Sequence, residues 1–220
     1  MKKVILVAIM ALLSANLFAQ VFIGGSLGIA TQSATDRLAN TSNSQFRFTL
    51  APNVGFKIND DMSVGGRIGF TVGSRTVGTV VTPDPTIFSI QPYFRYSFLT
   101  FGDFAIAGEA NVGMAFQSSK NVVTTPGMPD VTNKSNTTQF SLGVTPVLLY
   151  QLNKHITLEA NLNILTIGFA TSATKATTET GGATTTVQDD TQSSFVTAAN
   201  ATDVFGGGWG LIQIGFTYAF

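Results

Sequence analysis

The residues that could do chemistry are few, and most lack the partners that a catalytic or metal site needs. His155 is the only histidine among 220 residues, and the chain has no cysteine, which excludes thiolate metal sites. A serine or aspartate nucleophile needs a positioned base, and no other base stands out. The acidic pairs Asp60-Asp61 and Asp189-Asp190 lack further ligands, so solvated loops explain them better than calcium binding does. The sequence predicts no catalytic residue, no metal and no cofactor.

Two further features argue against phosphate and nucleic-acid ligands. Gly206-Gly207-Gly208 precedes a predicted strand, not the helix N-terminus on which a glycine-rich loop binds phosphate. The chain also balances 12 Lys+Arg against 12 Asp+Glu, so no nucleic-acid partner is expected. The charged fraction is only 11%, whereas a soluble domain has roughly 25%. Part of the surface is therefore not expected to face water.

The elements that must position the remaining charged residues are strands. Apolar and polar residues alternate with period two, which is typical of strands with one apolar face. Eight segments alternate in this way, at about 20–32, 46–58, 63–72, 88–98, 104–117, 140–150, 156–164 and 211–220.

The connections between these segments fall into two classes. Residues 59–61, 100–103 and 153–155 are tight polar turns, whereas 33–43, 75–85, 118–137 and 172–203 are long. Short and long connections alternate strictly, which places all short turns at one end of an antiparallel sheet. This asymmetry is typical of transmembrane barrels, whose short turns are periplasmic. We therefore expect an all-β chain, an eight-stranded antiparallel up-and-down transmembrane β-barrel, with His155 solvated in a periplasmic turn.

The orientation of the apolar face separates a membrane barrel from a soluble one. A lipocalin-like barrel keeps its apolar side chains inside and a charged wall outside, but here the polar face is mostly small and uncharged. Aromatic residues lie near strand ends, as an interfacial girdle requires: Phe56, Phe98, Phe104, Tyr150 and Tyr218. We therefore expect lipid outside. Three mid-strand prolines are expected to mark local bulges: Pro52, Pro92 and Pro146.

Counting from the short turns places several charged residues on inward positions. Four fall in the periplasmic half of the lumen: Arg67, Arg95, Glu109 and Glu159. Lys57 lies near that rim and Arg47 lies higher. Charges inside a narrow barrel are costly unless they are paired. Arg95 and Glu109 stand five to six residues either side of one turn, so they should face each other. We expect one lumen charge network.

Two interpretations of this network remain open. It is either a plug that fills and rigidifies the barrel, or a gate or selectivity element. Eight strands enclose about enough space for their own side chains, which favours the plug. Many small inward residues, among them Gly65, Gly69 and Gly113, would leave room for water and favour the gate.

The N-terminus has the pattern of a secretory signal. Lys2 and Lys3 precede an apolar run of about ten residues at 4–13, and a cut is expected between Ala19 and Gln20. Such a run is too short to cross a bilayer, which needs roughly 20 residues. We expect a signal peptide at 1–19 and one barrel domain at 20–220.

The C-terminus carries the most specific motif. Apolar residues occupy every second position up to the last one: Ile212, Ile214, Phe216, Tyr218 and Phe220. This motif resembles the terminal signature of bacterial outer-membrane barrels, and the chain resembles the small eight-stranded OmpA/OmpX/OmpW-like superfamily. The resemblance implies a location in the outer membrane, contact with its lipid, and recognition by the barrel-assembly machinery.

Three classes of function follow, in order of expectation. The first is a non-enzymatic membrane protein with a structural role or narrow passive, porin-like passage. The second is a surface binding or adhesion module that acts on an extracellular ligand through the long loops. The Thr-rich segment 171–203, expected to be mobile, would either serve adhesion or form a hydrated exterior. An outer-membrane enzyme is the last.

Overall fold

The computed structural model describes residues 20–36, 41–77, 80–123, 129–181, 183–196 and 212–220. The expected signal peptide at 1–19 and the Gly206-Gly207-Gly208 segment lie outside these residues. The described chain is almost entirely strand, in the order β1 (Gln20–Asp36), β2 (Thr41–Lys57), β3 (Met62–Val77), β4 (Val80–Pro83), β5 (Thr86–Phe101), β6 (Phe104–Val123), β7 (Val131–Gln151), β8 (Ile156–Asn161), the 3₁₀ turn η2 (Asn163–Leu165), β9 (Ile167–Thr180), β10 (Ala183–Val196) and β11 (Gln213–Ala219).

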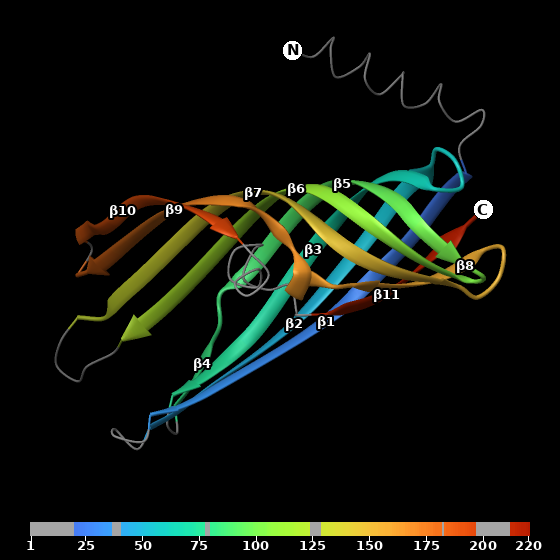
Figure 1. Cartoon of the computed structure of the whole chain (residues 1–220). Helices are drawn as coiled ribbons and strands as arrows, with labels where there is room; N and C mark the ends of the chain where they lie inside the picture. Colours follow the sequence, from blue (N-terminus) through green and yellow to red (C-terminus); the bar gives the residue numbers. More distant parts are fainter. Residues whose placement is uncertain (1–19, 37–40, 78–79, 124–128, 182, 197–211) are drawn as a thin grey trace, which may run out of the picture.

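Antiparallel pairing closes the sheet into a barrel (Figure 1). β1, β2, β3, β5, β6 and β7 pair in turn; β8 pairs with β7 and with β11, and β11 pairs with β1. This ring has eight strands and confirms the predicted fold. Phe220 donates its backbone N–H to Val21 at the same end as the short turns, called the turn end below. The opposite end is called the far end.

The short turns follow from local chemistry. The Asn59 side chain accepts the backbone N–H groups of Asp61 and Met62, and the Asn153 side chain does the same for His155 and Ile156. Gly102 turns the chain between β5 and β6 at a φ of 60°, a conformation that favours glycine.

The predicted strand 156–164 is wrong beyond Asn161, where the chain leaves the ladder and forms η2 before β9 resumes pairing with β7. Pro146 of β7 gives the reason. Its carbonyl accepts the backbone N–H of Leu162, and in an antiparallel ladder the N–H of the same residue would point to the same neighbour. Proline has no N–H, so the ladder is interrupted there.

The bulges predicted at Pro52 and Pro92 are also wrong. Bridged pairs of β2 and β3 stop after Leu50 and resume at Asn53 in unchanged register, and pairs of β5 and β6 do the same around Pro92. Each proline is a gap in the ladder on the side where its N–H is missing. In β5 the register shifts instead between Ser97 and Leu99.

The four long loops of the sequence prediction are largely strand. β6 and β7 remain paired up to Val123 and Val131, and β9 continues to Thr180 and turns back at Gly181 into β10. The Thr-rich segment predicted as mobile is therefore mostly a hairpin, because threonine favours strands and neighbouring ladders continue. Residues 197–203 of that segment lie outside the described part of the chain. The far-end parts of β6, β7, β9 and β10, at the left of Figure 1, are called the outer sheet below (residues 118–123, 131–137, 172–180 and 183–192).

The outward face of the barrel is an apolar belt, and the inward face is polar. Ile23, Leu27 and Ile29 of β1 are exposed, whereas Ser26 between them is buried. One aromatic row lies toward the far end, with Phe70, Phe88 and Phe116 on adjacent strands. Others mark the turn end: Phe56, Tyr96, Phe98, Phe104, Tyr150 and Tyr218. Among the described residues, no helix is long and apolar enough to cross a membrane.

Candidate functional site

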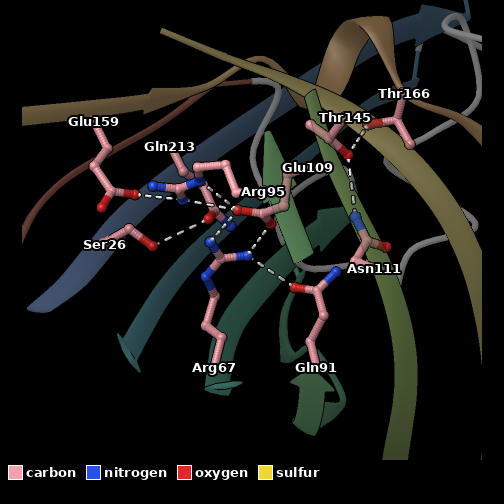
Figure 2. Close-up of polar contacts among 10 residues, drawn as sticks. All are labelled: Ser26, Arg67, Gln91, Arg95, Glu109, Asn111, Thr145, Glu159, Thr166 and Gln213. Carbon is pink, nitrogen blue, oxygen red and sulfur yellow. Dashed lines mark hydrogen bonds and ion pairs between the residues drawn. The ribbon is translucent and has the colours of Figure 1, made fainter. Parts of the chain in front are cut away.

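The candidate site is a cluster of charged side chains inside the barrel, contributed by four different strands. Arg67 comes from β3, Arg95 from β5, Glu109 from β6 and Glu159 from β8. Each stands at an inward position of an alternating strand, and none is more than 5% exposed. Figure 2 shows that the four converge on one another. The structure therefore brings together four of the six charged residues that the sequence placed in one lumen network.

Glu109 is the centre of this lumen charge network. Arg67 donates from Nη1 and Nη2 to the two carboxylate oxygens of Glu109, at 2.9 and 3.2 Å. Arg95, directly opposite Glu109 in the β5–β6 ladder, donates to it from Nη2 at 2.8 Å and from Nε at 3.3 Å. Arg95 Nη2 also lies 2.8 Å from Glu159. Two arginines and two glutamates thus form one neutral chain.

Tyr93 lies between the two arginines and was not predicted as part of the site. Its ring centroid is 5.0 Å from the guanidinium carbon of Arg67 and 5.3 Å from that of Arg95. An aromatic face near a cation is attractive, by about 1–2 kcal/mol when water is excluded. Gly65 makes room for this ring, since a Cβ there would overlap it. The one signal in the sequence was an aromatic residue on the polar side of its strand.

Uncharged polar residues lie around the four charged side chains (Figure 2). Gln91 accepts from Arg67 Nη1 at 3.0 Å, and Ser26 donates to Gln213 at 3.2 Å. Asn111, Thr145 and Thr166 form a further chain of hydrogen bonds.

The network divides the inside of the barrel into unequal spaces. At the turn end a cavity of about 300 Å³ reaches up to Arg95. On the other side of the network, a cavity of about 10 Å³ is lined by Arg67, Asn111 and Gln213. That volume is about one water molecule. Arg67 Nε, Asn111 Oδ1 and Gln213 Nε2 have no hydrogen-bond partner among the residues that the structure describes, so a single water there would find both donors and an acceptor.

Arg47 and Lys57, predicted as members of the same network, form no ion pair with its four residues. Arg47 Nε lies 2.6 Å from the buried carboxylate of Asp84, which also accepts from Gln45 at 2.6 Å. Lys57 lines the cavity at the turn end. Asp84 was missed because it follows β4, in a segment that the sequence pattern assigned to a loop and could not place.

His155 does lie in a short turn, but it is not simply solvated. Its Nδ1 is 2.8 Å from the carbonyl of Ala219, and its ring stacks on Tyr218 with centroids 5.6 Å apart. The side chains of the C-terminal motif all face outward: Ile212, Ile214, Phe216, Tyr218 and Phe220. His155 therefore contacts the last strand on its outer face. Among the described residues, no group of three His, Asp or Glu side chains could hold a metal ion.

Comparison with known proteins gives the fold and little more. No protein-family model and no curated protein matches the chain by sequence. A solved structure of a major outer membrane protein from Thermus thermophilus is similar over 92% of this chain and 100% of its own, with a TM-score of 0.52 and 14% identity. An outer membrane channel from Pseudomonas putida is 8% identical over 91% of this chain and 94% of its own, and its TM-score of 0.32 supports no conclusion. At this identity the likeness to the first protein is one of fold, and the chain has the β-barrel architecture of that outer membrane protein.

Proposed function

We propose that the chain is a non-enzymatic, integral outer-membrane β-barrel whose lumen is closed by the charge network, and that its role in the envelope is structural. The observation that carries this is the network itself. Arg67, Arg95, Glu109 and Glu159 come from four strands, are buried, and meet across the lumen at hydrogen-bonding distances. Closed packing of this kind is what an eight-stranded barrel needs to fill its interior.

The membrane location is supported by the outer wall. On β5 about ten residues separate Phe88 from Phe98, and a strand tilted by about 40° rises about 25 Å over that length. Both residues face outward from an apolar belt, and 25 Å is the height of the lipid-facing band in transmembrane barrels. In this proposal the turn end is periplasmic, the far end is extracellular, and a signal peptide is removed between Ala19 and Gln20.

The C-terminal motif is proposed to serve assembly. Its outward apolar side chains end at Phe220, and β11 closes the barrel between β1 and β8. The barrel-assembly machinery is the expected partner. Replacing Phe220 with alanine should lower the amount of folded protein in outer membranes, while refolding from urea into vesicles stays unchanged.

A conductance measurement distinguishes a structural role from a channel role. Wild-type protein reconstituted in planar bilayers should give no steady current steps, because the network crosses the lumen and the cavity next to it on the far side has a volume of only about 10 Å³. The Arg95→Ala variant removes the residue that joins the two glutamates and should increase leakage. Steady ion steps from the wild type would overturn the structural role and favour a narrow passive channel.

A second role, binding through the far end, is favoured by the outer sheet. Four paired strands project beyond the aromatic row, with polar residues on both faces. Thr174 of β9 and Asp190 of β10 are a bridged pair, so deleting residues 174–190 removes the tip of the hairpin. The strands of the barrel ring are left unchanged. Loss of cell adhesion by that variant, with the barrel still folded, would support the binding role.

A further inference from the structure

The cavity at the turn end of the lumen has the size and the lining of a small-molecule pocket. Its volume is about 300 Å³, at the lower end of the range for ligand pockets. Arg95 forms its inner end, where the ion pairs of the charge network cross the lumen. Apolar side chains, among them Phe22 and Leu149, lie beside hydroxyl groups in its wall. The cavity is therefore a pocket with its mouth at the turn end.

Two cations and a hydroxyl group stand side by side in the wall of this pocket. Lys57 of β2 is bridged to Ser63 of β3, and Ser63 is bridged to Arg95 of β5. All three line the pocket from inward positions of their strands. Neighbouring strands are about 4.8 Å apart, so the backbones at Lys57 and Arg95 are roughly 10 Å apart, with Ser63 between them. Their long side chains can therefore reach a single anionic group between them.

Both cations have donors that no described residue uses. Lys57 is half-buried and forms no ion pair with the residues that the structure describes. Arg95 is 5% exposed and uses Nε and Nη2 for the two glutamates, whereas its Nη1 donates to no residue of the described ranges. A buried donor without an acceptor is unfavourable. A carboxylate in the pocket would accept from Nη1 of Arg95, from the ammonium group of Lys57 and from the hydroxyl group of Ser63.

The mouth of the pocket carries the opposite charge. Asp60 and Asp61 line it from the β2–β3 turn, and Asp103 lines it from the β5–β6 turn. All three are exposed, and none forms an ion pair within the described part of the chain. Asp61 precedes Ser63 by two residues, a distance of about 7 Å along a strand. A ring of carboxylates just outside a row of donors attracts a cationic group and repels a free anion.

We propose that this pocket binds a small zwitterion of the amino-acid or short-peptide class. Its carboxylate accepts from Arg95, Ser63 and Lys57, and its ammonium group lies at the aspartates of the mouth. Donors inside and acceptors outside match the two ends of such a molecule, whereas phosphate satisfies only the inner set. Among the described residues, no three acidic side chains converge on a metal ion, so the aspartates fit an organic cation better. The inference needs the fold and the pocket, and it does not depend on the proposed membrane location.

The test compares three ligands that differ only at their ends. Isotope-labelled protein, refolded in detergent micelles, is titrated with glycylglycine, with N-acetylglycylglycine and with glycylglycine amide. Binding is followed by NMR at the backbone amides of Ser63 and Ser97, the second of which donates to the Asp61 carbonyl. Loss of the carboxylate should weaken binding at least about tenfold, because hydrogen bonds to charged groups are the stronger ones. Loss of the ammonium group should weaken it up to about fivefold, since the aspartates are exposed.

Variants with a matched control locate the site. Lys57→Gln should weaken glycylglycine binding up to about fivefold. In Asp60→Asn/Asp61→Asn, the advantage of glycylglycine over its N-acetyl derivative should shrink. Lys154→Gln removes the same charge from another short turn, whose residue 154 does not line the pocket, and should bind like wild type. Arg95 is left in place because it holds the charge network together, and the amide ligand tests its contribution instead.

Three results would overturn the proposal. Unchanged signals of Ser63 and Ser97 at millimolar glycylglycine would remove the site. Equal affinity for the three ligands, or an equal loss in Lys154→Gln and Lys57→Gln, would show that the pocket does not recognise the charged ends. Tighter binding of inorganic phosphate than of glycylglycine would identify a site for simple anions. The gel mobility of folded protein is read in the same samples, and the single variant Asp60→Asn replaces the double variant if that one does not fold.

Discussion

Replacing Glu109 with glutamine should destabilise the barrel far more than breaking an ion pair on its surface. Glu109 receives four N–H contacts from two arginines, at 2.8–3.3 Å, and is 1% exposed. Without its charge, Arg67 has Gln91 as its remaining neutral acceptor and Arg95 has only Glu159. Removing one partner from a buried pair costs about 3–5 kcal/mol, because a buried charge is left uncompensated. We expect a loss of that size in the free energy of unfolding.

The assay is urea unfolding in lipid vesicles, followed by circular dichroism and by the mobility of folded protein on gels. Lys134→Gln is the control, because the Lys134–Glu179 pair is close to half exposed and should contribute at most about 1 kcal/mol. Glu109→Gln combined with Arg67→Gln restores neutrality, so the double variant should lose less than the sum of the two single losses. The reasoning fails if Glu109→Gln costs no more than Lys134→Gln, or if the two losses simply add.

Further substitutions test the packing around the network and at the seam of the barrel. Tyr93→Phe should change the unfolding free energy by less than about 1 kcal/mol, because the hydroxyl has no hydrogen-bond partner in the described part of the chain, whereas Tyr93→Ala should cost about 3–5 kcal/mol in the same urea assay. Gly24→Ala should be destabilising by more than about 2 kcal/mol, since its Cβ would overlap the backbone of Phe216, while Gly66→Ala, whose Cβ would meet nothing within 4 Å, should be tolerated. His155→Ala should increase hydrogen exchange at the end of β11 near Ala219 and leave exchange at the far end unchanged, and equal protection in both proteins would contradict its contact with the last strand.

The sequence predicts the network well because the position of each member depends on only two features, the alternation of its strand and its distance from a short turn. Strand alternation decides that Arg95 points inward, and distance from the short turn decides its height, so the pair with Glu109 follows directly. Tyr93 and Asp84 were missed for different reasons. The alternation places Tyr93 on the inward face, but it does not predict that its ring contacts the two arginines. Asp84 was hidden, because its partner Arg47 is reached only through the β3–β4 hairpin, whose path no periodicity encodes.

The same limits explain the errors in the strands. An alternation of apolar and polar residues identifies a strand only where one of its faces is apolar. This alternation ends at the aromatic row, although the strands remain paired beyond it. The outer sheet has polar residues on both faces and therefore looks like loop. The break after Asn161 has a similar origin. It is caused by Pro146 on the neighbouring strand, and a pattern within 156–164 contains no information about what that strand can donate.

The charged lumen also explains how this sheet distinguishes its two faces. Shifting one strand by a single residue exchanges every inward and outward side chain. If the lumen were apolar, and the barrel lies in a membrane as proposed, such a shift would place one apolar face in lipid instead of another, at little cost. In the proposed membrane location, a shift of β3 or β5 would put the guanidinium of Arg67 or Arg95 into the lipid, at about 2–4 kcal/mol near the bilayer midplane. It would also leave Glu109 buried with one arginine partner instead of two. The network therefore penalises the shifted register twice, so its residues specify the pairing of β3, β5 and β6 even where their net contribution to stability is small.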